Sequence, residues 1–226
     1  MTGTRIATLD STLRDGAQGA GVAFSVEDKL AIVRALDSFG VDYIEAGNPA
    51  SNPKDAAFFE RAHSLALSRA KLCAFGSTRK KDTAVEEDRG VRALAAAGTS
   101  VVALFGKAWD MQVERVLETT AGENLRMIAE TVAYFKSLSK EVIFDAEHFF
   151  DGFRANPEYA LSCLRAAEQA GADVVCLCDT NGGTFPEDIA RITRAVAERF
   201  PQVTVGIHTH NDSGLAVANS LAAVEA

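Results

Sequence analysis

Cysteine is scarce in this chain, with four in 226 residues. Cys73 and Cys163 stand alone among apolar residues and are interpreted as core positions. Cys176 and Cys178 form a C-x-C pair, a spacing that can bind a metal, but two thiolates alone favour buried strand positions instead. The cysteines therefore predict packing in the core rather than a disulfide framework.

Long apolar runs and net positive charge are also missing. No stretch approaches the roughly 20 residues of a membrane-spanning helix. No signal peptide is expected, because residues 1–5 lead directly into a short strand. With 23 Lys and Arg against 31 Asp and Glu, the net charge is −8, which argues against a surface for nucleic acid or anionic membrane. The composition, 47% apolar, allows a sizeable core and predicts a cytoplasmic enzyme.

Short apolar runs alternate with helical stretches along the whole chain. Residues 25–28 resemble a capping box for a helix that ends at Gly40, and residues 83–86 repeat this start signal. Asn156 with Pro157 predicts another helix start. The expected strands are Ile6–Thr12, Val41–Gly47, Lys71–Gly76, Ser100–Gly106, Val142–Glu147, Asp173–Asp179 and Val203–His210.

Seven consecutive strand–helix units fit either an open doubly wound sheet or a (β/α)8 barrel. A doubly wound sheet gathers its ligand-binding residues at one switch point. Here polar residues follow strands one, two, five, six and seven, and only a closed ring brings such ends together. The sequence therefore predicts an α/β fold, a (β/α)8 TIM barrel of which residues 1–226 contain only the first seven units. The polar residues are Arg14, Asp15, Glu45, Glu147, Thr180, His208 and His210.

A barrel with seven of its eight units leaves strands one and seven without a partner. Unpaired amides at such edges are costly and invite aggregation. We therefore expect a C-shaped barrel with a gap one strand wide, and an isolated chain that is unstable or inactive.

Two histidines one position apart, His208 and His210, come at the end of the last expected strand. Side chains two apart on a strand point to the same side, so both imidazoles converge on one point, where they suit a divalent metal. An H-x-H pattern alone is a weak signal. Residues 10–16, at the end of the first strand, add a carboxylate and an arginine, and together the two clusters predict a metal site beside an anion-binding group.

Several motifs then resemble a known family. Residues 12–16 (Thr-Leu-Arg-Asp-Gly), 43–45 (Tyr-Ile-Glu) and 208–212 (His-Thr-His-Asn-Asp) are similar to the DRE-TIM metallolyases, metal-dependent acyl-CoA aldol enzymes. The similarity to the citramalate synthase branch is carried by residues 15–19, 24–29, 51–55, 145–152 and 178–183. Family members continue into an eighth barrel unit and a C-terminal regulatory or dimerisation region. The resemblance thus implies that residues 1–226 are a catalytic barrel domain, truncated before its eighth unit and lacking the regulatory region, of a protein that is a homodimer at full length.

The resemblance also implies a reaction, in which acetyl-CoA, pyruvate and water give (R)-citramalate and CoA, a step of isoleucine biosynthesis. Asp15, His208 and His210 would hold a divalent ion, Mg²⁺, Mn²⁺ or Zn²⁺, with an asparagine of the eighth unit completing the site. Pyruvate can chelate such an ion through its carboxylate and keto oxygens, which polarises the carbonyl group.

The same resemblance assigns roles to four further residues. Arg14 would stabilise the alkoxide that forms on the keto oxygen, and Glu45 would hold Arg14 in place. Glu147 would remove a proton from the acetyl methyl group, and Thr180 would bind the keto-acid carboxylate. Replacing Arg14 is expected to lower turnover with little loss of stability. The simpler alternatives are a salt bridge at the strand end for Arg14 and a hydrogen bond to substrate for Glu147.

The basic run Arg79-Lys80-Lys81 follows the third strand on the same face of the barrel and could meet the phosphates of CoA. Its alternative interpretation is a solvated surface. For the whole chain, the alternative functions are an isopropylmalate or homocitrate synthase that acts on a larger 2-keto acid, a lyase of the same family, or an inactive barrel fragment.

Overall fold

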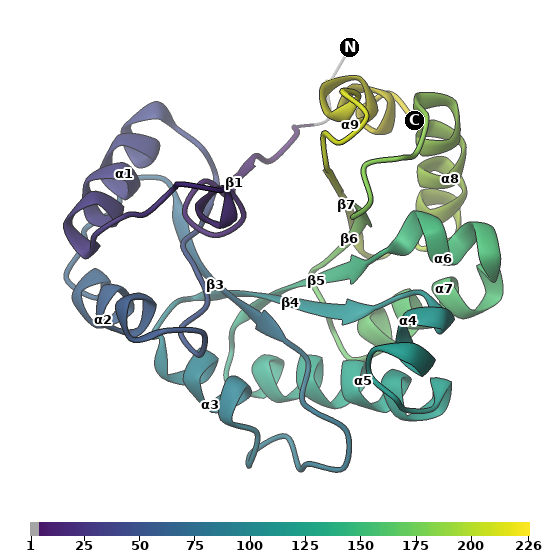
Figure 1. Cartoon of the computed structure of the whole chain (residues 1–226), viewed down its shortest axis with the longest axis horizontal. Coiled ribbons are helices and arrows are strands. Elements are labelled where there is room, and N and C mark those ends of the chain that lie inside the picture. Colours follow the sequence, from purple (N-terminus) through teal and green to yellow (C-terminus); the bar gives the residue numbers. More distant parts are fainter. Residues whose placement is uncertain (1–4) are drawn as a thin grey trace.

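The computed structural model describes residues 5–226 and contains one sheet of seven parallel strands, hydrogen-bonded in sequence order. The sheet curls, and the helices lie outside it (Figure 1). The strands are β1 (Leu9–Asp10), β2 (Tyr43–Glu45), β3 (Lys71–Ser77), β4 (Val101–Lys107), β5 (Glu141–Glu147), β6 (Val174–Asp179) and β7 (Thr204–Thr209). The predicted α/β barrel with seven units is therefore confirmed.

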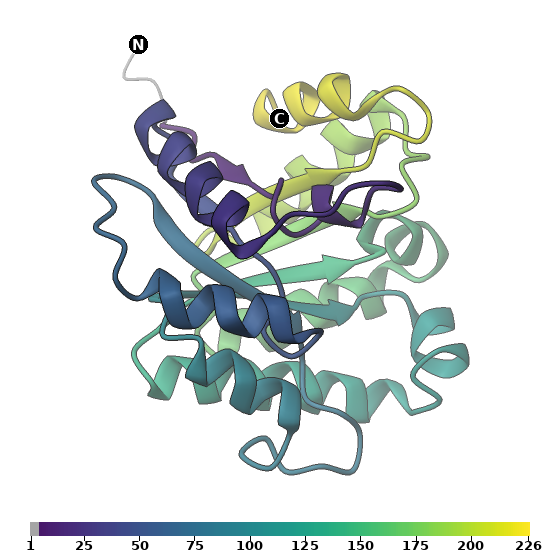
Figure 2. The ribbon, with the colours of Figure 1, turned by 60° about the vertical axis from the view of Figure 1, so that its left-hand side comes forward.

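The outer layer consists of helices that follow the strands in order (Figure 2). They are α1 (Val26–Phe39), α2 (Pro53–Ala62), α3 (Arg89–Ala96), α4 (Asp110–Arg115), α5 (Ala121–Ser137), α6 (Phe149–Ala155), α7 (Pro157–Gln169), α8 (Pro186–Arg199) and α9 (Ala216–Val224), with a 3₁₀ turn η1 at Gly16–Gln18. None of these helices is long and apolar enough to cross a membrane.

The barrel is open between its first and last strands. Within residues 5–226, β1 pairs with β2 and β7 pairs with β6, and no ladder joins β1 to β7. A cavity of about 1720 Å³ lies there, lined by Ile6 and Leu9 on one side and by Ile207 and Val224 on the other. The predicted C shape is thus confirmed, whereas a gap of one strand width remains a prediction.

The first strand is shorter than expected, since Ile6–Thr12 reduces to Leu9–Asp10. This edge strand has a ladder on one side only. Its end is set by a turn in which the Arg14 and Gly16 N–H groups both donate to the Ser11 carbonyl, at 3.1 Å each. The strand therefore stops early, and its carboxyl end leads directly into the site.

Two of the three predicted helix starts are confirmed. Ser25 forms a capping box with Asp28, and the Asn156 side chain accepts the N–H of Tyr159 before Pro157. The start predicted at residues 83–86 is wrong, because these residues form a turn and α3 begins only after Asp88. The Asp88 carboxylate accepts the N–H groups of residues 90 and 91, which makes it the stronger cap.

The two faces of the sheet pack differently. The outer face and the helices form the main apolar core, while a second cluster fills the concave face. That inner cluster consists of Cys73, Val101, Ala103, Ile143, Cys176 and Cys178. All four cysteines are buried free thiols, so the prediction that they pack in the core is confirmed.

Gly152 of α6 lies where the helix touches the chain after β4. A β-carbon at Gly152 would lie 2.2 Å from the carbonyl oxygen of Ala108, which is backbone and cannot rotate away. We expect Gly152→Ala to lower the free energy of unfolding by about 1–3 kcal/mol, as overpacking does. Gly122→Ala in α5, where nothing lies within 4 Å, should instead raise it by about 0.5–1 kcal/mol. Urea unfolding of both variants measures this, and equal effects would contradict the packing argument.

Candidate metal and substrate site

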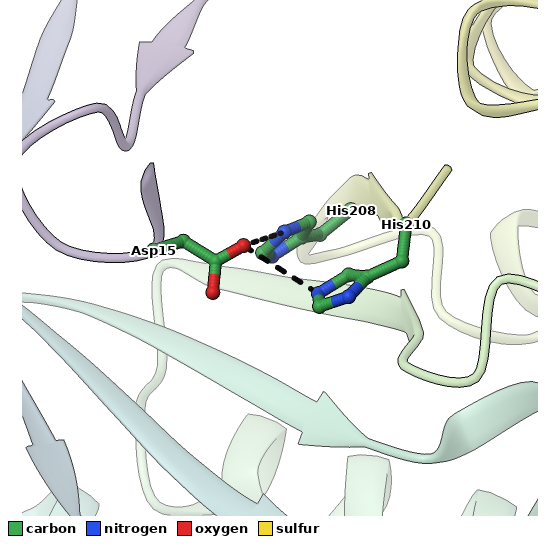
Figure 3. Close-up of side chains that lie close together, drawn as sticks. All are labelled: Asp15, His208 and His210. Atoms are coloured by element: carbon green, nitrogen blue, oxygen red, sulfur yellow. Dashed lines mark ion pairs between the residues drawn. The ribbon is translucent and has the colours of Figure 1, made fainter. Parts of the chain in front are cut away.

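Asp15, His208 and His210 lie together at the carboxyl end of the barrel (Figure 3). The Nε2 atoms of His208 and His210 are each 3.6 Å from Oδ2 of Asp15, and donor atoms of all three residues lie within 4.8 Å of one another. The predicted convergence of the three side chains is therefore confirmed.

Local structure explains this convergence. The turn closed on the Ser11 carbonyl directs Asp15 into the barrel. His208 lies in β7 opposite Cys178 of β6. His210 is held beside the end of β6 because its N–H donates to the carbonyl of Asp179 at 3.3 Å. The three candidate ligands thus come from the two edges of the open barrel.

The charges of this cluster fit a divalent cation. Contact with His208 is the main cause that lowers the pKa of Asp15 to about 2, against the opposing effect of burial and with help from Arg14. The same contact raises the pKa of His208, although burial works against it. One carboxylate and two imidazoles are a donor set that Mn²⁺, Mg²⁺ or Zn²⁺ accepts. The residues therefore fit the group that the sequence predicts.

Arg14 is fixed beside this cluster by three contacts. Its Nε lies 2.5 Å from Oε2 of Glu45 and its Nη1 lies 2.9 Å from Oδ1 of Asp15. The guanidinium carbon sits 3.9 Å from the ring centroid of Phe75, an arrangement that favours a cation over an aromatic face. Burial raises the pKa of Glu45 to about 7, and Arg14 opposes this rise. Glu45 thus lies where it can hold Arg14, as the sequence suggested.

Glu147 ends β5 on the concave face and forms an ion pair that the sequence analysis missed. Nζ of Lys107 lies 2.7 Å from Oε2 of Glu147, and the two residues are directly opposite in the β4–β5 ladder. Lys107 is the last residue of its strand, so the rule that selected the other strand-end residues could have found it. The ammonium group fixes the direction of the Glu147 carboxylate.

Thr180 follows β6 and accepts a hydrogen bond of 2.8 Å from the backbone N–H of His148. Its own hydroxyl proton remains available to a substrate carboxylate. His148 has a left-handed backbone, φ 58°, and its Nδ1 lies 3.4 Å from Oδ2 of Asp151. The backbone at residue 148 therefore positions Thr180, while the imidazole turns toward α6.

The predicted CoA-binding run is only partly exposed. Arg79 is 4% exposed, and its guanidinium pairs with Glu123 at 2.7 Å and with Glu130 at 2.6 Å. The structure therefore corrects the expectation for Arg79, which ties its loop to α5 instead of facing a phosphate. Lys81 donates to the carbonyl of residue 118, while Lys80 is exposed and its CoA-binding role remains a prediction.

Comparison with known proteins agrees with this geometry. The model of the family described as HMGL-like matches residues 5–226. An (R)-citramalate synthase of Aquifex aeolicus is 57% identical over 97% of this chain, and one of Synechocystis is 50% identical over 99%. A 2-isopropylmalate synthase of Synechocystis is 37% identical over 98% of the chain and 41% of its own length. The chain spans 42% of the length of each of the two citramalate synthases.

Solved structures show the same fold. The HMG-CoA lyase from Brucella melitensis superposes with a TM-score of 0.79 at 21% identity, over 99% of this chain and 78% of the lyase. The hydroxymethylglutaryl-CoA lyase from Pseudomonas aeruginosa superposes with a TM-score of 0.78 at 24% identity, over 96% of this chain and 72% of the lyase.

Proposed function

Because the chain belongs to the HMGL-like family, we propose that it carries the catalytic site of an (R)-citramalate synthase, which condenses acetyl-CoA with pyruvate and hydrolyses the thioester. The observation that carries this proposal is the convergence of the Asp15–His208–His210 cluster with the fixed guanidinium of Arg14. Identities of 48–57% to citramalate synthases support it. The domain boundary, the homodimer and the cytoplasmic location remain predictions.

The keto acid is bound by groups on opposite sides of the barrel end. Asp15, His208 and His210 would hold a divalent cation, which when bound supplies Lewis-acid polarisation of a keto group. The Thr180 hydroxyl can donate to the substrate carboxylate. Arg14 presents N–H donors where the keto oxygen gains negative charge, and it is fixed there by Glu45 before the reaction begins. Such preorganised donors act on the transition state more than on the bound substrate.

In the proposed reaction Glu147 acts as the base. A methyl proton of the acetyl thioester passes to the Glu147 carboxylate, and the carbon left behind bonds to the keto carbon, whose oxygen becomes the alkoxide beside Arg14. Lys107 keeps the carboxylate oriented through its 2.7 Å contact. The alkoxide takes up a proton to become the hydroxyl group, and water then cleaves the thioester so that CoA leaves as the thiol.

Substrate choice tests this function directly. We expect pyruvate to have a higher kcat/KM than ketoisovalerate or oxoglutarate, because identity falls to 37% for a 2-isopropylmalate synthase and 36% for a homocitrate synthase. Added methylenes change binding in an apolar pocket by only about 1–3 kcal/mol. The three acids are therefore compared at equal concentration, with acetyl-CoA and Mn²⁺, in a longer chain that has its eighth βα unit. A higher kcat/KM for a larger acid would favour a sister synthase instead.

The remaining alternative is that residues 1–226 fold as an inactive fragment. Citramalate formation by this chain and by a longer chain with an added eighth βα unit separates the two cases. Activity of the longer chain alone would support the predicted need for the eighth unit, while equal activities would contradict it.

A further inference from the structure

The C-x-C pair of β6 has no part in the proposed reaction. Cys176 and Cys178 are two residues apart on one strand, so both thiols face the barrel interior. Cys178 is 6% exposed and both are free. The sequence analysis favoured core packing for these two cysteines, because two thiolates alone are too few to form a metal site.

The structure adds two further donors to this pair. In the strand ladders Asp145 of β5 lies opposite Cys176, and Cys178 lies opposite His208 of β7. A carboxylate oxygen of Asp145, Sγ of Cys178 and a ring nitrogen of His208 lie within 4.8 Å of one another. Three adjacent strands thus direct an oxygen, a sulfur and a nitrogen toward one point.

Asp145 gives an independent reason to expect a cation here. Asp145 is 7% exposed, and within residues 5–226 its carboxylate forms no ion pair. The guanidinium of Arg14 pairs with Asp15 and Glu45 instead. The neighbour of Asp145 is the neutral thiol of Cys176, and a buried carboxylate that no cation pairs is costly. A bound cation would remove that cost.

We propose that Asp145, Cys178 and His208 form a second metal position, which takes a thiophilic divalent cation such as Zn²⁺ or Cd²⁺. Thiolate donors select soft metals, whereas the oxygen and nitrogen donors at Asp15 and His210 also accept Mg²⁺ and Mn²⁺. Binding displaces the Cys178 thiol proton to solvent as the metal–sulfur bond forms. An ion can enter through the open cavity, whose wall includes Asp145, Cys176 and His208.

Sharing of His208 links the two positions. The same imidazole contributes to the Asp15–His208–His210 cluster, so an ion at the inner position and an ion at the outer position affect each other. We therefore expect Zn²⁺ or Cd²⁺ to weaken the binding of Mn²⁺.

The proposal is tested by Cd²⁺ titration of the metal-free chain, followed by the ultraviolet charge-transfer absorption of cadmium–thiolate bonds. The wild type should show this absorption at one equivalent. Cys178→Ser should abolish it, and Asp145→Asn should raise the Cd²⁺ Kd at least about 10-fold, the low end of what losing even an outer-shell partner costs. Cys163→Ser, which removes a buried thiol elsewhere, should change nothing.

His210→Ala separates the inner position from the outer one, and it should retain the absorption. If Cys178→Ser fails to fold, the ¹¹³Cd chemical shift of the wild-type complex reports sulfur ligation without any substitution. A wild type without sulfur ligation, an absorption that persists in Cys178→Ser, or an unchanged Kd in Asp145→Asn would each overturn the proposal. These measurements do not depend on catalysis, so they test the second metal position separately from the citramalate synthase activity.

Discussion

Replacing Glu147 by glutamine is expected to lower turnover about 10²–10⁴-fold, the usual range for loss of a general base, in a chain that has its eighth unit. Glutamine keeps the shape of the side chain but cannot take the methyl proton. Pyruvate should still bind, because its contacts lie at Arg14, Thr180 and the metal ligands. Single-turnover kinetics with acetyl-CoA, together with equilibrium binding of pyruvate, measure the two effects separately.

Glu141→Gln is a matched control for this experiment. Glu141 lies on the same strand and the same face, but at the opposite end of β5, where it pairs with Lys71 at 2.5 Å. Its replacement should leave turnover unchanged within about twofold, while any effect appears in stability. Near-normal turnover in Glu147→Gln would show that Glu147 is not the base and only contacts substrate.

The fold could be predicted from the sequence because its periodic signals are strong. Six of the seven strands, β2 to β7, were located within two residues at each end, since each is a short apolar run bounded by helix signals. The edge strand β1 was predicted too long, because its end depends on the turn at Ser11. The start of α3 was misplaced because the helix is capped by Asp88, whose carboxylate accepts the N–H groups of residues 90 and 91, and not by residues 83–86.

The positions of the site residues could be predicted where they depend only on lying at the end of a strand. Asp15, His208 and His210 converge because parallel strands end at one edge, which the barrel fold already implies. Arg79 was misjudged because its partners, Glu123 and Glu130, come from a distant helix. Such contacts between elements have no signal in local sequence.

Asp145 shows the same limit at shorter range. It lies two residues before Glu147 inside a motif that was recognised, yet its closeness to Cys178 and His208 appears only when β5, β6 and β7 are placed side by side. Lys107 depends likewise on the β4–β5 register. The sequence identifies the residues with reactive or charged side chains, and the register between strands determines which of them come into contact.

Arg14→Lys is expected to lower turnover about 10²–10³-fold, as loss of one oxyanion donor does. Lysine keeps a positive charge near Glu45 but lacks the planar fork that contacts Glu45 and Asp15 together. Steady-state kinetics should place this loss in kcat, because the interaction is made only in the transition state. Near-normal kcat would mean that Arg14 has only the structural role of a salt bridge.

The ion pair with the buried Glu45 leads us to expect a loss of stability when Arg14 is replaced, whereas the sequence alone suggested little loss. The side chain of Glu45 is 2% exposed, and Arg14→Gln would leave this buried carboxyl group without its cationic partner, at a cost of about 3–5 kcal/mol. The double variant Arg14→Gln/Glu45→Gln removes both charges and should regain most of that stability, while turnover stays low. Urea unfolding and kinetics on the same two proteins therefore separate the structural role of Arg14 from the catalytic one. Turnover that returned with stability would show that Arg14 serves the fold alone.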